Sequence, residues 1–366
     1  MQKKVIAAVI GGLLIAPAAF ADVTISGRLS TGLDIYSLDS GKAAAPAASY
    51  SKEQRISDQS SSIVFSGSED LGGGLSAWFR LDNRFSFPDA GFSASGNTLV
   101  GLKGGFGTIG IGRSDLHYHE MFRYDARSAG SLQSWLSGSA FSQVGATAIA
   151  NGTRTPNVIK WDGSFGAVSA TLAYSTAGNT AAATEGSGKG ATDGGKGDVT
   201  TAALRWQGGP LSLGASIWNS KEEAAVAANL KQSSSRVWGG YDIAGGFSVA
   251  LGYDQSSVES AGVKTERTSV FIPAKFKTGA ETFYASYLMA DDLDVGGTTT
   301  SNSGATGVSI GWDHALSKKT VIGAHYTKLD NDANAVYQVY SRSNSGTAAA
   351  AGESVSQIYF GIAHFY

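Results

Sequence analysis

The feature that most constrains this chain is a two-residue alternation of apolar and polar side chains, which recurs along most of the sequence. In the segment 23–36, Val23, Ile25 and Leu33 fall on one face, and Thr24 and Asp34 fall on the other. A period of two is typical of β-strands with one apolar and one polar face, so we predict an all-β fold. The same period occurs in segments 75–86, 167–174, 200–206, 211–218, 247–254, 281–289, 306–312 and 320–328.

The predicted strands are joined by two kinds of connection. Tight, mostly Gly-rich turns are expected at 68–74, 104–107, 162–166, 207–210, 242–247, 277–281 and 313–319. Long polar connections are expected at 37–54, 88–96, 114–153, 175–198, 219–234, 255–265, 290–304 and 330–354. If each tight turn joins two strands, and one further strand lies at each end, the chain holds about sixteen strands.

The first residues read as a targeting segment. Lys3 and Lys4 form a basic region, an apolar stretch follows over 5–16, and Ala19-Phe20-Ala21 has the small-x-small pattern of a cleavage site. We therefore predict a cleaved signal peptide over 1–21 and a single barrel domain over 22–366. The chain has no cysteine, which removes disulfide and thiol chemistry.

Several observations favour a closed barrel that spans a membrane. Beyond residue 21 no stretch approaches the ~18 continuous apolar residues of a spanning helix, so strands would have to cross. The polar face is rich in Ser, Thr, Gly and Arg, which suits a water-filled interior. A β-sandwich shows the same alternation, but it gives no reason for aromatic residues to gather at both strand ends. Those aromatic residues, all on the apolar face, are Trp161, Trp206, Tyr241 and Trp312 before tight turns, and Tyr174, Tyr253, Tyr287 and Tyr326 before long loops.

One long connection has an unusual composition. The third loop, 114–153, contains Met121, Phe122, Leu132, Trp135 and Phe141, which is more apolar content than an exposed loop needs. Because loops of this length in compact proteins are usually functional, we predict that it folds into the barrel interior. By contrast, the low-complexity tracts 177–197 and 297–307 are expected to be mobile.

Four segments resemble the general porins of Gram-negative outer membranes, most closely the trimeric betaproteobacterial and neisserial type. They are SSIVFSGSEDLGGGLSAWFRLD at 61–82, NTLVGLKGGFGTIGIGR at 97–113, NVIKWDGSFG at 157–166 and VSQIYFGIAHFY at 355–366. The resemblance implies a passive diffusion channel for ions and small hydrophilic solutes, in a homotrimer embedded among outer-membrane lipid and lipopolysaccharide. It implies neither enzymatic activity nor a cofactor, and no nucleic-acid partner is expected.

The resemblance also implies a pore constriction in which acidic groups of the third loop face a basic wall. The acidic set is Asp115, Glu120 and Asp125, and the basic wall is Arg28, Arg80, Arg84, Lys103, Arg154 and Lys160. Because Ser62 and Asn97 stand where relatives carry basic residues, only a weak anion preference is expected. Arg113 lies in the alternation on the same face as the apolar residues, so it should either lie above the apolar band or be turned inward by a bulge at Gly110–Gly112. The final aromatic residue, Tyr366, corresponds to the aromatic assembly signal of the family, where Phe is usual.

Other interpretations were weighed against this one. An aromatic track along the interior, from Trp78, Trp218, Trp238 and Tyr284, would indicate a substrate-selective porin for sugars or organic anions. A barrel enzyme would need a nucleophile and base that the sequence does not provide, and a plugged structural barrel fits poorly with a Ser/Thr/Gly/Arg interior. The segment His117–Glu120 and the Asp291, Asp292 and Asp294 tract could in principle hold a metal, but we predict no metal site.

Overall fold

The computed structural model describes residues 22–44, 52–86, 91–93, 96–116, 121, 124, 141–145, 147–149, 151, 154–177, 196–222, 230–339 and 350–366. The predicted signal peptide, 1–21, lies outside these residues. The strands are β1 (Asp22–Asp39), β2 (Lys52–Asp58), β3 (Ser61–Gly72), β4 (Leu75–Phe85), β5 (Phe92–Ser93), β6 (Thr98–Gly104), β7 (Gly107–Ser114), β8 (Gln143–Val144), β9 (Thr147–Ala148), β10 (Thr155–Phe165), β11 (Val168–Ala177), β12 (Lys196–Gly208), β13 (Leu211–Glu222), β14 (Lys231–Ile243), β15 (Phe247–Ser260), β16 (Val263–Thr278), β17 (Glu281–Ala290), β18 (Leu293–Val295), β19 (Thr298–Thr300), β20 (Ala305–Ala315), β21 (Thr320–Asn331) and β22 (Ser354–Phe365).

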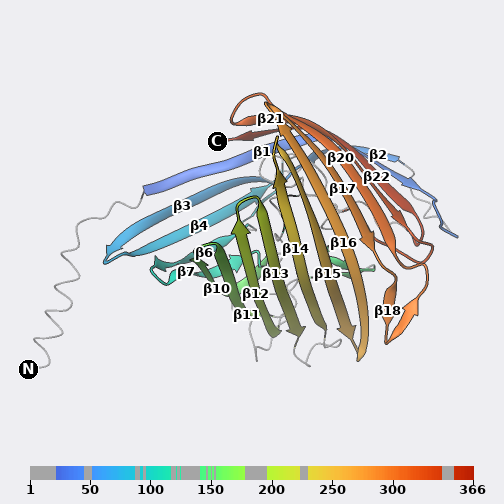
Figure 1. Ribbon diagram of the computed structural model, residues 1–366, viewed down its shortest axis with the longest axis horizontal. Helices are drawn as coiled ribbons and strands as arrows, with labels where there is room; N and C mark the ends of the chain where they lie inside the picture. Colours follow the sequence, from blue (N-terminus) through green and yellow to red (C-terminus); the bar gives the residue numbers. More distant parts are fainter. Residues whose placement is uncertain are drawn as a thin grey trace, which may run out of the picture.

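The long strands form one antiparallel sheet that closes on itself (Figure 1). Each wall strand pairs with the next one in the chain, and β1 pairs with β22 from Arg28↔Phe365 to Asp39↔Ser354. Strands β2 and β3 follow one another along β1 and act as one wall strand, interrupted at Gln59 and Ser60. The described strands therefore make a closed barrel of sixteen, which confirms the predicted fold.

Short turns connect neighbouring strands at one end of the barrel, which we call the short-turn end. We call the opposite end the loop end. All seven predicted tight turns join consecutive wall strands, for example Gly73–Gly74 between β3 and β4. The glycines at 72–74 have φ of 83°, 62° and 79°, a region that side chains with a Cβ rarely adopt. The turn glycines are thus required by backbone geometry.

Two predicted long loops are instead ordered hairpins. In place of a loop at 255–265, β15 and β16 continue outward and meet at Ala261–Gly262, whose φ values of 51° and 82° suit a two-residue turn. In place of a loop over 290–304, β18 and β19 pair through Gly296–Gly297. These strand segments carry polar residues on both faces, since strands beyond the membrane need no apolar face. A prediction based on apolar alternation therefore does not detect them.

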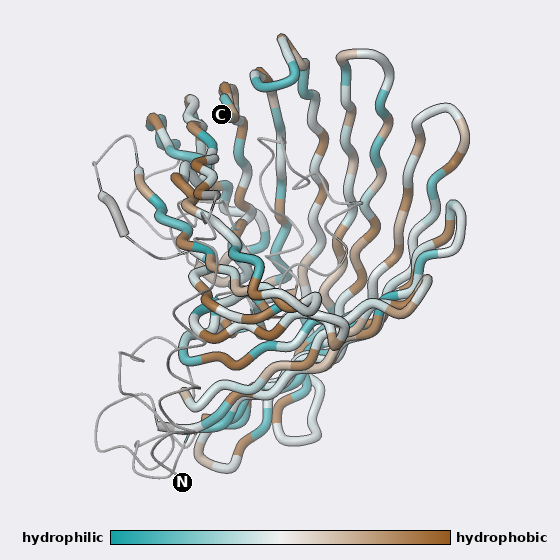
Figure 2. The backbone as a smooth tube through the Cα atoms, turned by 90° about the vertical axis from the view of Figure 1, so that its left-hand side faces the viewer, coloured by the Kyte–Doolittle hydropathy of each residue, from teal (hydrophilic) through white to brown (hydrophobic). Residues whose placement is uncertain are grey.

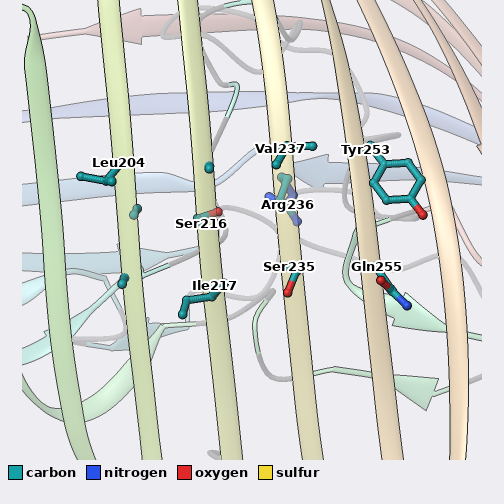
Figure 3. A pocket seen from close by; sticks show the side chains of 11 residues that line it. Leu204, Ser216, Ile217, Ser235, Arg236, Val237, Tyr253 and Gln255 are labelled. Atoms are coloured by element: carbon teal, nitrogen blue, oxygen red, sulfur yellow. The ribbon is translucent and has the colours of Figure 1, made fainter.

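The predicted faces agree with the structure. The hydropathy colouring alternates along the strands in Figure 2. Across β12–β15 the apolar side chains Leu204, Ile217, Val237 and Tyr253 are exposed on the outer surface (Figure 3). The expected aromatic residues lie on the outward face, and Trp161 and Trp312 additionally donate from Nε1 to Phe106 O (2.7 Å) and Glu281 Oε2 (2.5 Å).

The closing strand is tied to the first strands by polar contacts. Inside the barrel, Gln357 Nε2 donates to Asp34 Oδ1 (2.7 Å). Outside, the Tyr366 hydroxyl donates to the carbonyl of Ser62 (3.1 Å), with its ring over Gly27. Ser62, which replaces an expected basic residue, thus takes part in closing the barrel through its main chain. Among the described residues, none of the helical stretches is both long and apolar enough to span a membrane.

Candidate pore constriction

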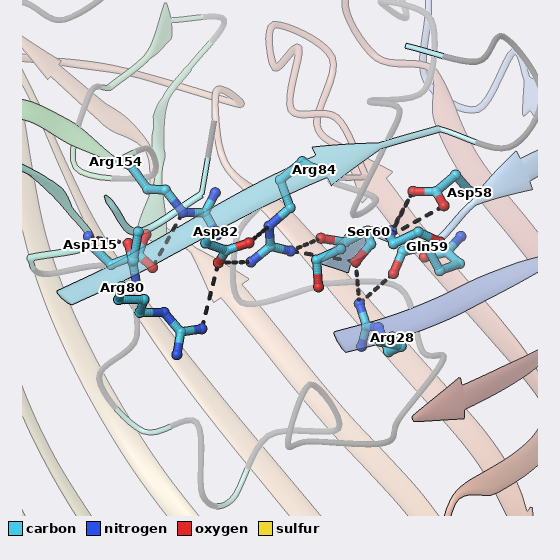
Figure 4. Close-up of polar contacts among 12 residues, drawn as sticks. Arg28, Asp58, Gln59, Ser60, Arg80, Asp82, Arg84, Asp115 and Arg154 are labelled. Atoms are coloured by element: carbon cyan, nitrogen blue, oxygen red, sulfur yellow. Dashed lines mark hydrogen bonds and ion pairs between the residues drawn. The ribbon is translucent and has the colours of Figure 1, made fainter. Parts of the chain in front are cut away.

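An arginine cluster lines the interior where β1, β3 and β4 meet the break between β2 and β3 (Figure 4). Ser60 has a positive φ of 69°, and Asp58 accepts hydrogen bonds from the N–H groups of Ser60 (2.7 Å) and Ser61 (3.0 Å), which fixes this break. Arg28 Nη2 donates to the carbonyls of Gln59 and Ser60, the latter at 3.1 Å. The irregular backbone therefore presents carbonyl groups that orient Arg28 along the wall.

Asp82 on β4 orients two further arginines (Figure 4). Its carboxylate, which is almost fully buried, pairs with Arg84 Nε at 2.8 Å and with Arg80 Nη2 at 3.7 Å. Arg84 Nη1 also donates to Ser60 Oγ (2.5 Å), which links the two halves of the cluster. The Arg84 side chain is 25% exposed and that of Arg80 is 43% exposed, so both guanidinium groups reach solvent. We call Arg28, Arg80, Arg84 and Asp82 the arginine wall.

A second polar group lies at the root of the third loop. Asp115 Oδ2 lies 3.6 Å from Arg154 Nε, and Asn97 Oδ1 accepts the Asp115 N–H (2.9 Å). The half-buried Arg113 lies within electrostatic range of both Asp115 and Arg154. Opposite it, β10 carries an irregularity between Thr155 and Val158, so the bulge is on the neighbouring strand rather than at the Gly110–Gly112 segment. Arg113 thus belongs to this polar group.

The two predicted lysines lie nearer the short-turn end. Lys160 pairs with Asp162 (3.0 Å) on the inner face, where Asp162 also accepts from Thr171. Lys103 is exposed one residue before the end of β6 and has the inward parity that was expected, because its neighbours Val100 and Leu102 are exposed outside. Of the predicted acidic loop residues, only Asp115 can be located, since Glu120 and Asp125 lie outside the described residues.

The described residues of the third loop lie against the inner wall of β14–β16. A Cβ on Gly252 would stand 2.2 Å from the sulfur of Met121, and a Cβ on Gly240 would stand 2.3 Å from the ring of Tyr124. Met121, Tyr124 and Phe141 are buried in one apolar cluster with wall residues such as Phe271. Glycines on the wall therefore make room for large loop side chains, as the inward-folded loop requires.

Two more arginines lie beneath this loop. Asp254 on β15 pairs with Arg236 (3.0 Å) and with Arg267 (3.1 Å), and these arginine side chains are only 2% and 0% exposed. The guanidinium of Arg236 lies 4.2 Å from the ring centroid of Phe141, a cation–π contact. We call Arg236, Asp254 and Arg267 the covered cluster.

Described residues of the eighth loop, 332–339 and 350–353 between β21 and β22, also pack inward. Gln143 of the third loop donates from Nε2 to Gln338 O (3.1 Å), and its Oε1 accepts the Gln338 N–H (3.2 Å). Tyr337 is buried in the same apolar cluster as Phe141, and this burial raises the pKa of its hydroxyl. The described residues of the two loops therefore form a joint layer over the wall from β14 through β22 to the loop end of β1, where Tyr36 belongs to the same cluster.

The interior aromatic track that would indicate a substrate-selective porin is only partly exposed to the passage. Trp218 is fully buried in a cluster with Leu116 and Val158, and Trp238 packs against Tyr124 with ring centroids 6.2 Å apart. Both indoles thus serve to seat the third loop. Trp78, which packs over Gly110, and Tyr284 are the remaining members on the inner face.

Reasoning from sequence missed two acidic centres of the interior. Asp82 lies two residues from both Arg80 and Arg84, so the Arg-x-Asp-x-Arg spacing on one strand face was a usable signal. Asp254 and its partners come from three separate strands, and only their register brings them together. The described residues contain no group of three or more potential metal ligands.

Comparison with known proteins settles the family. A family model described as "Gram-negative porin" matches residues 5–334. The chain belongs to the Gram-negative porin family. This porin is accordingly a transmembrane β-barrel of the Gram-negative outer membrane and a transport protein rather than an enzyme.

Individual relatives of this porin are more distant. The major outer membrane protein P.IB of Neisseria meningitidis serogroup B is 37% identical over 115 residues, which are 31% of this chain and 34% of that protein. The match therefore spans about a third of that relative's length. The anion-selective porin from Comamonas acidovorans shares the fold with a TM-score of 0.75 and 21% identity, over 94% of this chain and 100% of the other. OmpT of Vibrio cholerae in its trimer form shares the fold with a TM-score of 0.66 and 13% sequence identity, over 94% of this chain and 99% of the OmpT chain.

Proposed function

We propose that this porin is a passive diffusion channel for ions and small hydrophilic solutes, with its constriction between the arginine wall and the third loop. The observation that carries the proposal is the division of the interior. Described residues of the third and eighth loops cover one part of the wall, and another part, on β4, presents the guanidinium groups of Arg80 and Arg84 to solvent. Solutes would pass along the charged, hydrated side.

The local charge balance supports a weak preference for anions. In and beside the arginine wall, three guanidinium groups stand against the two carboxylates of Asp82 and Asp58, and the Asp115–Arg154 pair is close to neutral. In a narrow aqueous passage with low-dielectric walls, such an excess raises the local concentration of anions. The Comamonas relative, described as anion-selective, fits this proposal.

The test is the zero-current potential of the refolded porin in a planar bilayer under a KCl gradient. The double variant Arg80→Gln/Arg84→Gln should shift the potential toward cation preference, because two exposed positive charges leave the passage while glutamine keeps similar side-chain bulk. Lys319→Gln, at a short turn and outside the interior passage, is the control. An unchanged potential in the double variant would disprove the assigned constriction, and an absence of conductance steps in the wild type would disprove the channel itself.

A substrate-selective channel is the second candidate, favoured by one observation. A cavity of about 560 Å³ near the short-turn end is lined by Tyr284, Lys277, Lys318, Asp313 and Thr282, a mixture suited to a small organic anion. Flux of such a solute would then saturate, and Tyr284→Ala would abolish the saturation. Flux that rises linearly with concentration for sugars and organic anions alike would exclude this candidate.

We further propose that the porin assembles as a homotrimer. Support comes from the shared fold of OmpT, which has been described in a trimer form. Native mass spectrometry of the detergent-extracted protein should give a mass of three chains. A monomer mass across a range of mild detergents would refute this assembly.

A further inference from the structure

The cavity at the short-turn end has a lining that is divided into an apolar part and a charged part. Its volume is about 560 Å³, and it lies on β16, β17 and β20–β22, which are neighbours in the barrel (Figure 1). The lining residues come from these strands and from the turns 279–280 and 316–319. Pockets that bind small molecules have volumes in this range, and they combine apolar walls with a few charged groups that fix the orientation of the ligand.

The apolar part of the lining is unusual for a water-filled interior. Val321 on β21 and Phe365 on β22 line the cavity together with Tyr284, and neither Val321 nor Phe365 is fully buried. Apolar surface that stays in contact with water is unfavourable, and a ligand that covers it gains the free energy of its burial. Because two of the three side chains carry rings, an aromatic ligand would gain ring contacts in addition.

The charged part of the lining consists of two lysines. Lys277 on β16 and Lys318 in the turn 316–319 are exposed, and among the described residues no hydrogen bond or ion pair engages either ammonium group. The carboxylate in the lining, that of Asp313, is buried and lies 3.0 Å from Nε2 of His325. The lining therefore keeps an excess of positive charge, and a carboxylate placed between the lysines would receive charge-assisted hydrogen bonds from both.

Strand pairing connects the cavity to the arginine wall. Across the seam between β22 and β1, Phe365 of the cavity pairs with Arg28 of the arginine wall. An anion that has passed along the arginine wall is therefore one strand away from the cavity. Within an enclosed passage, successive positive groups raise the local concentration of anions along this route.

We propose that this cavity binds a small aromatic carboxylate of the benzoate type. The carboxylate would lie between Lys277 and Lys318, and the ring would lie against Phe365, Val321 and Tyr284. An inorganic anion would leave the apolar part of the lining in water, and a neutral aromatic compound would leave both lysines without a partner. An aromatic carboxylate would be the solute of the substrate-selective channel named above as the second candidate, on which this assignment rests.

Isothermal titration calorimetry of the refolded porin with benzoate tests the charged part of the cavity. The double variant Lys277→Gln/Lys318→Gln should weaken benzoate binding about tenfold or more, because it removes two charge-assisted hydrogen bonds. Lys319→Gln, in the same turn but outside the lining, is the control and should bind benzoate like the wild type. Conductance in KCl should show that the double variant still forms a channel. Equal benzoate binding to the wild type and to this variant would overturn the proposal.

A second acid tests the aromatic part of the assignment. Cyclohexanecarboxylate has the same charge and a similar size, and it should bind to the wild type about threefold or more weakly than benzoate, because it makes no contact between aromatic rings. Tyr284→Leu should reduce this preference while the lysines remain in place. Equal binding of the two acids to the wild type would overturn the aromatic assignment, and so would complete displacement of benzoate by an equal concentration of acetate.

Flux into proteoliposomes separates this assignment from the candidate function on which it rests. Saturable benzoate flux that is lost in the double variant Lys277→Gln/Lys318→Gln would support both. Linear benzoate flux together with saturable benzoate binding would support the binding site and exclude only the substrate-selective channel. Saturable flux of another organic anion, with no detectable binding of benzoate, would overturn the aromatic assignment and leave the candidate function in place.

Discussion

The arginine wall and the covered cluster use the same chemistry in opposite settings. In both, one buried aspartate holds two arginines, Asp82 with Arg80 and Arg84, and Asp254 with Arg236 and Arg267. Around Asp82 the arginines reach solvent, whereas around Asp254 they are almost completely enclosed. The comparison teaches that an inward-facing arginine is available to solutes only where the third loop leaves it uncovered.

The largest expected effect is a loss of stability when the central aspartate of each cluster, Asp254 or Asp82, is replaced separately. Asp254→Ala leaves two enclosed guanidinium groups without their carboxylate and should lower the free energy of unfolding by about 3–5 kcal/mol. Asp82→Ala should cost only about 1–2 kcal/mol, because water can solvate the released arginines. Urea titration of the lipid-refolded barrel measures both. Equal losses would show that the two clusters do not differ in the way their exposure indicates.

The next effect concerns the attachment of the third loop. Phe141→Ala removes a buried ring that also contacts Arg236, and it should weaken the packing of the loop on the wall by about 3 kcal/mol. Single-channel recordings should then show a larger and noisier conductance. Phe141→Leu, which retains much of the apolar volume, should stay closer to wild type. An unchanged conductance in Phe141→Ala would mean that the loop is held elsewhere.

The smallest effect is expected between the two inward loops. Gln143→Ala removes two hydrogen bonds to the main chain of Gln338 and should cost about 1–2 kcal/mol. Amide hydrogen exchange around 337–339 should accelerate, while the arginine wall is unaffected. If exchange there does not change, the eighth loop is seated by the packing of Tyr337 alone.

The sequence predicted the barrel well because alternation and turn glycines are local signals. The parity of Arg28, Arg80 and Arg84 follows directly from their strands, and so does the inward direction of Trp218 and Trp238. The sequence could not predict which of these inward arginines are covered by loop residues. The loop residue Phe141 is 95 positions from Arg236 in the sequence, and no local pattern indicates their contact. The polar hairpin of β15 and β16 was missed for a different reason, since above the membrane the strand loses its apolar face.

The seam between β1 and β22 has a consequence for how the molecule forms. The hydrogen bond from Gln357 to Asp34 joins residues 323 positions apart, and bringing such distant segments together from an open chain costs about 5 kcal/mol of loop entropy. That cost falls once the intervening hairpins have zipped up in order, because each one shortens the remaining gap. The seam is therefore the natural last step of assembly, and its contacts, including that of the Tyr366 hydroxyl with Ser62, report completion of the ring rather than its initiation.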